Sequence, residues 1–301
     1  MKKNKVVKRI FKKLIGKTMS VKRQAVVKEV KNEVIAVDLG GTHMRVSRVI
    51  GRKIIDYASV NTPKEKTVLL TTLCDMIARL KNSSTRGIGV GCAGFIQEGV
   101  IVKSVNLPLS RFDLKKYLAK RFRVPVEVIN DAHAHALAEL HYGVQKKNFV
   151  LLTLGTGIGG GIVIDGKLQF RNGGGEVGHM ILDNGKDFES LSASKALYSL
   201  TKKEFGKAMM ISELVAEKNV RSQEVLMALA DYLGQGIANL CAIFNPEVVV
   251  LAGGMREGGM IFLHMVEASY MKHTFLPKTT RVVWSHLAHP GTLGASLLLS
   301  T

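Results

Sequence analysis

The sequence predicts an α/β fold with two similarly built domains around a cleft. The chain has 301 residues, above the usual size of a single domain, and 46% of them are hydrophobic, which is enough for a core. Apolar runs typical of buried strands alternate with stretches of helical periodicity. Two glycine-rich turns, at 38–42 and 154–161, each join two apolar strands, and helices follow each pair.

The first block contains the elements of the predicted N-terminal domain. Its strands are rich in Val and Ile, and the sequence Asn61-Thr62-Pro63 separates the third strand from the first helix. The expected elements are strands over 34–41, 44–50 and 53–60, a helix over 67–80, a strand over 87–96, a helix over 113–122 and a strand over 124–130.

The second block repeats this order. Gly143 ends the helix that opens the block, and Asp165-Gly166 is typical of a hairpin turn. The expected elements are a helix over 131–142, two strands and a hairpin within 148–170, a mostly helical region over 189–244, a strand over 246–254, a helix, a strand near 281–284 and a final helix from about Thr292.

Residues 1–31 form a strongly basic N-terminal segment. They carry twelve Lys or Arg residues against the single Glu29, a net charge of +11 out of +19 for the whole chain. Apolar residues within 6–15 have helical spacing, which favours a basic amphipathic helix. Adhesion to an anionic membrane surface or to nucleic acid is one interpretation. A solvated extension without a partner is the other.

The three cysteines, Cys74, Cys92 and Cys241, lie far apart and include no CxxC pair. Neither a disulfide framework nor a cysteine-based zinc site is therefore expected. The expected location is the reducing environment of the cytoplasm. No run of about 18 apolar residues predicts a membrane span.

The first glycine turn has the composition of an anion site. Its residues bring bare backbone N–H groups close together, and Asp38 at the end of the preceding strand could hold magnesium through water. An ordinary glycine hairpin explains the turn equally well. The residues concerned are Asp38, Gly40, Gly41, Thr42 and His43.

The second glycine turn repeats the strand–turn–strand pattern. No Gly-Lys-Ser/Thr follows it, and a strand follows instead of a helix, so it is neither a P-loop nor a dinucleotide fingerprint. Two such turns facing each other across a cleft could hold a triphosphate, and a third glycine pair could lie against a base and ribose. The residues concerned are Gly155, Thr156, Gly157, Gly159, Gly160, Gly253 and Gly254.

Five segments, in this order, resemble the ROK (repressor, open reading frame, kinase) family of sugar kinases: VIAVDLGGTHMRVSRV, NDAHAHALAE, LLTLGTGIGGGIVIDGKL, GGGEVGHM and NPEVVVLAGG. The resemblance covers roughly residues 33–300. It implies the two-domain actin-like ATPase (ribonuclease H-like) fold. The implied organisation is an extension over 1–32, a small domain over 33–130 completed by a C-terminal helix over 290–301, and a large domain over 131–289.

The resemblance also implies roles for individual residues. Asp131, at the start of a helix, matches the family's catalytic base, although an Asp there is also a common helix cap. A helix N-terminus should keep its carboxylate ionised. Asn106 matches a sugar-binding amide, and Asn130 is a further candidate for sugar contact. His133 and His135 depart from the family pattern and are interpreted as helix-surface residues rather than metal ligands. His43 in the first glycine turn also departs from the pattern, and its phosphate contact is left open.

The stretch GGGEVGHM implies sugar-binding roles for Glu176 and His179. In the family this His usually also binds a structural zinc with three cysteines, which precede another sugar-binding Glu. Here Glu189 keeps that place, but no cysteine lies between it and His179. A single His cannot hold a structural zinc. We therefore expect a zinc-free loop, ordered by packing through Ile181, Leu182 and Phe188.

The resemblance implies an ATP- and magnesium-dependent hexose kinase, most specifically one for glucose, that forms a homodimer. An N-acetylated amino sugar such as N-acetylglucosamine or N-acetylmannosamine, or fructose, is the alternative substrate. A sugar-sensing regulator is the alternative from another class. Family repressors carry an N-terminal helix-turn-helix domain, and the basic segment is too short for one.

Overall fold

The computed structural model describes residues 33–299. The predicted amphipathic helix within the basic N-terminal segment lies outside the described residues, as do the last two residues of the predicted C-terminal helix.

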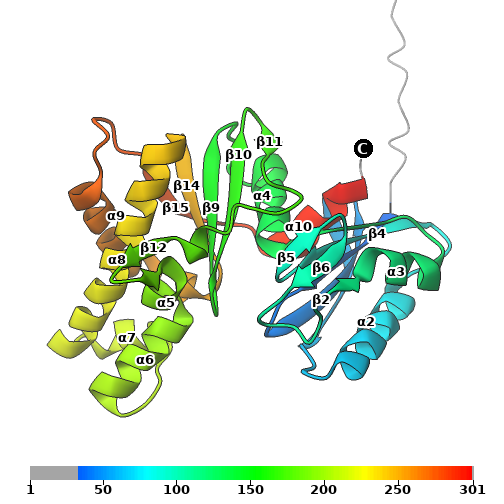
Figure 1. Cartoon of the computed structure of the whole chain (residues 1–301), viewed down its shortest axis with the longest axis horizontal. Coiled ribbons are helices and arrows are strands. Elements are labelled where there is room, and N and C mark those ends of the chain that lie inside the picture. Colours follow the sequence, from blue (N-terminus) through cyan, green and yellow to red (C-terminus); the bar gives the residue numbers. More distant parts are fainter. Residues whose placement is uncertain (1–32, 300–301) are drawn as a thin grey trace, which may run out of the picture. The chain divides into compact units, whose positions relative to one another are not determined.

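The first sheet has five strands in the order β3-β2-β1-β4-β8 (Figure 1). The strands β1 and β2 form an antiparallel hairpin around the first glycine turn, while β4 and β8 run parallel to β1. The bounds are β1 Glu33–Leu39, β2 His43–Ile50, β3 Lys53–Asn61, β4 Thr85–Cys92 and β8 Val126–Asn130.

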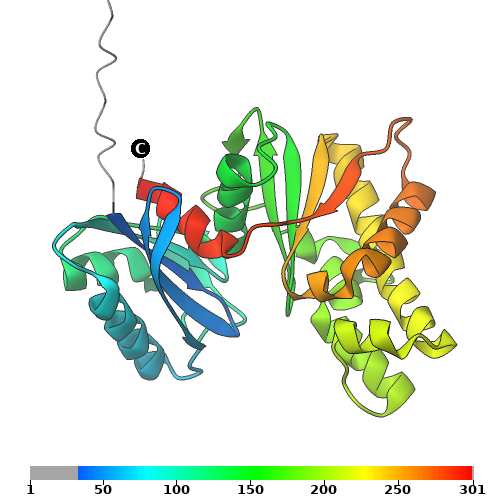
Figure 2. The same cartoon turned by 180° about the vertical axis from the view of Figure 1, so that it is seen from behind.

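Side-chain alternation in β1 divides the packing of this sheet into two faces. Ile35 and Val37 join one buried cluster with α2 (Lys66–Leu80) and α3 (Leu114–Phe122). Ala36 faces the other side, where it joins Ala295 of α10 (Pro290–Ser296). The C-terminal helix therefore covers the first sheet, and it also contacts α4 (Asp131–Tyr142), as Figure 2 shows.

The second sheet repeats the plan of the first, with the order β11-β10-β9-β14-β15. The strands β9 and β10 form a hairpin around the second glycine turn, and β14 and β15 run parallel to β9. The bounds are β9 Phe149–Leu154, β10 Ile158–Ile164, β11 Lys167–Leu168, β14 Val248–Ala252 and β15 Arg281–Trp284. The α/β fold with two similarly built parts is confirmed.

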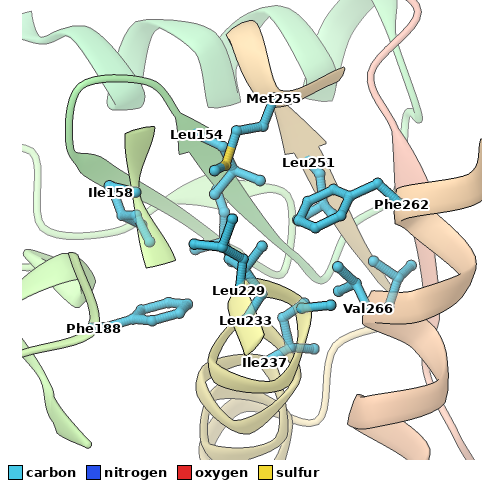
Figure 3. Close-up of a cluster of buried hydrophobic side chains, with 14 of the residues drawn as sticks. Leu154, Ile158, Phe188, Leu229, Leu233, Ile237, Leu251, Met255, Phe262 and Val266 are labelled. Carbon is cyan, nitrogen blue, oxygen red and sulfur yellow. The ribbon is translucent and has the colours of Figure 1, made fainter. Parts of the chain in front are cut away.

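The larger core lies on one face of the second sheet. There Leu152, Leu154 and Leu251 pack against the helical region, while the opposite face packs against Ala136 of α4. Figure 3 shows Phe188 pointing toward α8, which carries Leu229 and Leu233. The helices are α5 Phe188–Ser192, α6 Ser194–Phe205, α7 Ile211–Glu217, α8 Val220–Phe244 and α9 Gly259–His273.

The helix α8 alone among the described helices is long and apolar enough to cross a membrane. Of its most apolar window 56% is buried inside the structure, and Leu229, Leu233 and Ile237 belong to the larger core. This is the pattern of a core helix.

Small elements were missed by the sequence-based assignment. The expected strand over 87–96 is two strands, and its second part belongs to a separate three-stranded sheet. A two-stranded hairpin lies between His179 and Phe188. The additional elements are β5 Phe95–Gln97, β6 Val100–Lys103, β7 Phe112–Asp113, β12 Ile181–Asp183, β13 Lys186–Asp187 and the short helices η1 Val177–His179, η2 Gly254–Gly258 and η3 Leu297–Leu299.

Candidate functional site

Asp131 is the first residue of α4 and follows β8 directly. The cap of this helix is Asn130, whose Oδ1 accepts hydrogen bonds from the N–H groups of Ala132 and His133 at 2.8 and 3.2 Å. Asp131 Oδ1 also accepts from Ala132 N, at 3.0 Å. The alternative of Asp131 as the helix cap is therefore wrong, and its carboxylate has an oxygen to spare.

The pKa of Asp131 is raised from its ordinary value to about 7. Burial is the largest cause, and the charge of Asp38 is the next; Glu176 adds a smaller effect of the same sign. Hydrogen bonds from the start of α4 lower the pKa by less. The expectation that the helix N-terminus keeps Asp131 ionised is wrong, because burial beside other carboxylates outweighs it.

Asp38 is buried near the end of β1, and Arg45 Nη1 donates to its Oδ2 at 3.0 Å. The two residues are direct partners in the β1–β2 hairpin register. The helix α10 also lies against Asp38, because a Cβ on Gly291 would come within 2.6 Å of Asp38 Cγ. Asp38 is thus held between the first glycine turn and the C-terminal helix. Arg45 was missed, although hairpin register pairs it with Asp38.

The two predicted glycine turns lie side by side. The hydroxyl oxygens of Thr42 and Thr156, which are 114 residues apart in sequence, are 3.4 Å apart. The first turn is closed by a hydrogen bond from Gly40 N to the carbonyl of His43, at 3.1 Å, and the side chain of His43 is exposed. Lys64 Nζ, which the sequence analysis did not single out, donates to Gly41 O at 2.7 Å.

The glycines of these turns fall into two groups. A Cβ built on Gly155 or on Gly254 meets nothing within 4 Å, so open space lies over both backbones. Gly253 has φ +98° and lies against Leu154 O, which brings the third glycine pair to the end of β9. The other glycines face protein atoms at 3.0 Å or less, among them Gly41 (Asn106), Gly157 (Glu189), Gly159 (Thr153) and Gly160 (Val177).

Glu176, His179 and Glu189 come together beside the second glycine turn. Burial is the largest cause that raises the pKa of Glu176; the charge of Glu189 raises it further and His179 lowers it. Glu189 Oε2 accepts a hydrogen bond from Ile158 N at 2.9 Å. His179 Nδ1 lies 3.1 Å from Asp187 Oδ2, and the His179 side chain is 59% exposed. The cluster offers acceptors and one imidazole to a polar ligand.

The two predicted amide contacts differ in their freedom. Asn130 uses its Oδ1 for the helix cap and donates from Nδ2 to Gly94 O at 3.0 Å, so both ends of its amide are engaged with the protein. Asn106 is exposed and packs on Gly41 in the first turn. Of the two, Asn106 is the amide that a ligand can reach.

The interpretation of His133 and His135 as helix-surface residues is wrong. His133 is only 3% exposed, and its pKa falls to about 4, chiefly through burial and to a lesser extent through Arg171. Burial also lowers the pKa of His135, and the Nδ1 atoms of both rings are buried without a hydrogen-bond partner. Neither belongs to a metal cluster, since residues 33–299 contain no group of three or more His, Cys, Asp or Glu side chains that could hold a metal ion.

The segment between His179 and Glu189 is a hairpin, not an irregular loop. Its turn, Asn184-Gly185, has positive φ at both residues, and Asn-Gly is the strongest short sequence signal for such a turn. Phe188 is fully buried and Leu182 packs against the same core, as expected, but Ile181 is 63% exposed because it points away from it. Tyr232 of α8 supports the hairpin through a 3.0 Å hydrogen bond to Asp183.

Comparison with known protein families identifies the family of this chain. The model of the ROK family matches residues 34–301. The chain belongs to the ROK family. The glycine turns, Asp131 and the Glu176–His179 stretch all lie within the matched residues.

ROK proteins similar to this chain include both enzymes and regulators. A xylose repressor from Caldicellulosiruptor bescii is 27% identical over 87% of this chain and 76% of its own length. A glucokinase from Halalkalibacterium halodurans is 28% identical over 78% of this chain and 84% of its own. The crystal structure of a ROK glucokinase from Streptomyces griseus, with glucose and AMPPNP, shares the fold at a TM-score of 0.79, with 24% identity over 89% of this chain and 99% of that one.

The ROK fold in these proteins is the two-domain actin-like ATPase fold, as the sequence predicts. The boundaries of the two domains at 130 and 289, and the sugar and nucleotide roles of the individual residues, stay predictions.

Proposed function

We propose that this ROK protein is an ATP-dependent kinase of a hexose, with glucose as the substrate and glucose 6-phosphate as the product. The observation that carries the proposal is Asp131: a carboxylate with a free oxygen and a pKa of about 7, beside two glycine turns. A general base works best when its pKa lies near the operating pH. The raised pKa of Asp131 matches this requirement.

The proposed reaction is phosphoryl transfer. Asp131 accepts the proton of the sugar hydroxyl as the hydroxyl oxygen bonds to the γ-phosphorus of ATP. The bond from that phosphorus to the β–γ bridging oxygen breaks, and ADP leaves. The other hydroxyls of the sugar are held by side chains whose donors and acceptors suit a polyol: Glu176, His179, Glu189 and the exposed Asn106. Glu176 also lies close enough to Asp131 to influence its pKa, so ligand groups and base share one site.

The second glycine turn and the third glycine pair, Gly253-Gly254, have the space to bind ATP. Open space over Gly155 and Gly254 lets a ligand lie directly against the backbone, the phosphates at the second turn and the base and ribose at the third glycine pair. The first turn contributes Thr42, whose hydroxyl lies beside that of Thr156. Phosphates held there would be bound by both turns.

Magnesium fits the charge at Asp38. The charges of Asp38 and Asp131 repel each other strongly enough to raise the pKa of Asp131, and Arg45 is the one cation that pairs with Asp38 among the described residues. A divalent cation held through water by Asp38 would offset this repulsion. When bound, magnesium neutralises the charge of the transferred phosphoryl group. We propose no zinc, a homodimer and a cytoplasmic location.

The test is a panel of sugars with ATP and magnesium, run with the wild type and Asp131→Asn. The wild type should phosphorylate glucose faster than N-acetylglucosamine, N-acetylmannosamine or fructose. The asparagine keeps the shape but cannot take a proton, so kcat/KM should fall by about 10²–10⁴-fold. Equal rates in the two proteins would refute the assigned base.

A sugar-sensing regulator is the second candidate, because one relative of similar identity is a xylose repressor. The same panel separates the two functions. Saturable binding of a sugar without phosphorylation of any member of the panel would favour the regulator. Turnover that depends on Asp131 favours the kinase.

A further inference from the structure

Asp187 contacts or positions two of the proposed sugar-binding residues, His179 and Glu189, although Asp187 is not itself proposed to bind the sugar. It ends the β12–β13 hairpin and lies eight residues after His179. Its Oδ2 lies 3.1 Å from His179 Nδ1, so one carboxylate oxygen is committed to the imidazole. The side chain of Asp187 is 26% exposed, whereas that of His179 is 59% exposed.

The other carboxylate oxygen caps α5. Asp187 Oδ1 accepts from Ser190 N at 2.9 Å, and Ser190 Oγ donates back to the carbonyl of Asp187, also at 2.9 Å. The helix that is fixed in this way carries Glu189, which accepts from Ile158 N in the second glycine turn. One residue thus holds both His179 and the helix of Glu189.

The base of the hairpin fixes Asp187 itself. Phe188 N donates to Met180 O at 2.7 Å, and the fully buried ring of Phe188 lies against Gly236 of α8. A Cβ on Gly236 would come within 2.4 Å of that ring. Because the next residue is anchored in the core, the carboxylate of Asp187 has a defined position.

We propose that Asp187 is a positioning residue of the sugar site, which fixes the ring orientation and the tautomer of His179 while its helix cap places Glu189. This inference rests on the proposed function. A carboxylate only accepts hydrogen bonds, so His179 Nδ1 carries the hydrogen and Nε2 becomes the acceptor for a sugar hydroxyl. No hydrogen bond joins Nε2 to another residue within 33–299, which leaves it available to a ligand.

The charge state of Asp187 agrees with this role. Burial on its own raises the pKa of the carboxyl, but the hydrogen bonds from Ser190 and His179 together hold the pKa below its ordinary value. Asp187 is therefore ionised at neutral pH, as an acceptor from Nδ1–H must be.

Asp187→Asn separates the two tasks. Asparagine caps helices about as well as aspartate, so Oδ1 can keep its bond to Ser190. The amide nitrogen then faces His179 and donates to Nδ1, which forces the imidazole hydrogen onto Nε2. We expect the KM for the sugar to rise by up to about tenfold, the upper end for the loss of one hydrogen bond between neutral groups, with the KM for ATP unchanged.

Asp113→Asn is the matched control. Asp113 caps α3 in the same way, through a 2.8 Å bond to Lys116 N, but it has no histidine partner. Both variants should show the same small change in melting temperature, and only Asp187→Asn should change the KM for the sugar. Equal KM values in the two variants would overturn the proposal.

The double variant of Asp187→Asn with His179→Ala tests the route. If Asp187 acts on the sugar through His179, its substitution adds nothing once the imidazole is gone. If the two substitutions raise the KM for the sugar by independent factors that multiply in the double variant, the positioning role is contradicted.

A direct readout of the tautomer does not depend on activity. Nitrogen-15 NMR of the imidazole should find the hydrogen on Nδ1 in the wild type and on Nε2 in Asp187→Asn. The same tautomer in both would overturn the proposal even in an active enzyme. Suppose that the tautomer changes as predicted but the chain neither binds nor phosphorylates any sugar. That result would support the contact between Asp187 and His179 and would refute only the proposed function.

Discussion

At the scale of single residues, Asp131 has an environment that makes its charge depend on pH near neutrality. Its folded pKa of about 7 lies above the ordinary value of an aspartate because of burial and of the neighbouring Asp38. The raised pKa favours the protonated form in the folded state, so ionisation through pH 7 costs stability but creates the base. Stability and activity of this site thus change in opposite directions.

The pH profile of kcat/KM follows from this sign. Below its pKa Asp131 is protonated and cannot accept the hydroxyl proton, so kcat/KM for the sugar should fall about tenfold per pH unit below about pH 7. Above that point the acid limb should level off. Initial rates at subsaturating sugar, measured in buffers of constant ionic strength, check this; a profile that is flat down to about pH 5 would contradict it.

At the scale of elements, the start of α4 connects stability with catalysis. Asn130→Ala removes two capping bonds and the bond to Gly94 O, which should cost about 1–2 kcal/mol of stability. Because the cap fixes the position of Asp131, kcat should fall as well, while the KM for the sugar changes little. Denaturant unfolding together with steady-state kinetics measures both effects.

Asn219→Ala is the control for this change. Asn219 caps α8 through a 2.8 Å bond to Ser222 N, and no proposed site residue lies on that helix. It should lose a similar amount of stability and keep its kcat. A rise of the sugar KM in Asn130→Ala without a loss of kcat would instead favour direct contact between Asn130 and the sugar.

The β12–β13 hairpin gives a prediction about metal content. His179 is held by Asp187, and Phe188 anchors the end of the hairpin in the core, so the segment has partners without a metal. The purified chain should contain well under one zinc ion per chain by elemental analysis, and treatment with a chelator should leave its melting temperature unchanged. One tightly bound zinc per chain would contradict this.

The sequence was most informative where chemistry is local. The hairpins at both glycine turns and the position of Asp131 after β8 follow from apolar periodicity and turn residues. Burial of His133 was not predictable, because the second sheet that covers α4 comes from later segments of the chain. The β12–β13 hairpin was predictable from Asn184-Gly185. The sequence-based expectation of a loop there rests instead on the absence of cysteines between His179 and Glu189.

At the scale of the whole molecule, the chain returns to its beginning. After β15 it leaves the second sheet, and α10 packs on β1 and β4 of the first. A Cβ on Gly89 would lie 1.9 Å from the carbonyl oxygen of Ala295, so helix and sheet are in direct contact. Together with the contact between Gly291 and Asp38, this makes the C-terminal helix part of the proposed magnesium site.

Removal of residues 1–31 tests whether the basic segment belongs to the catalytic unit. Every proposed site residue lies between Asp38 and Gly254, and the helix that supports Asp38 ends before residue 300. The truncated chain should therefore keep kcat and both KM values within about twofold, which is below the roughly tenfold effect of one oriented hydrogen bond.

The net charge of the truncated chain falls by 11, so any binding to anionic vesicles or to nucleic acid should be lost. In the full chain that binding should weaken as salt increases. Kinetics beside vesicle sedimentation over a salt series measure both; a loss of kcat on truncation would show that the segment contributes to catalysis.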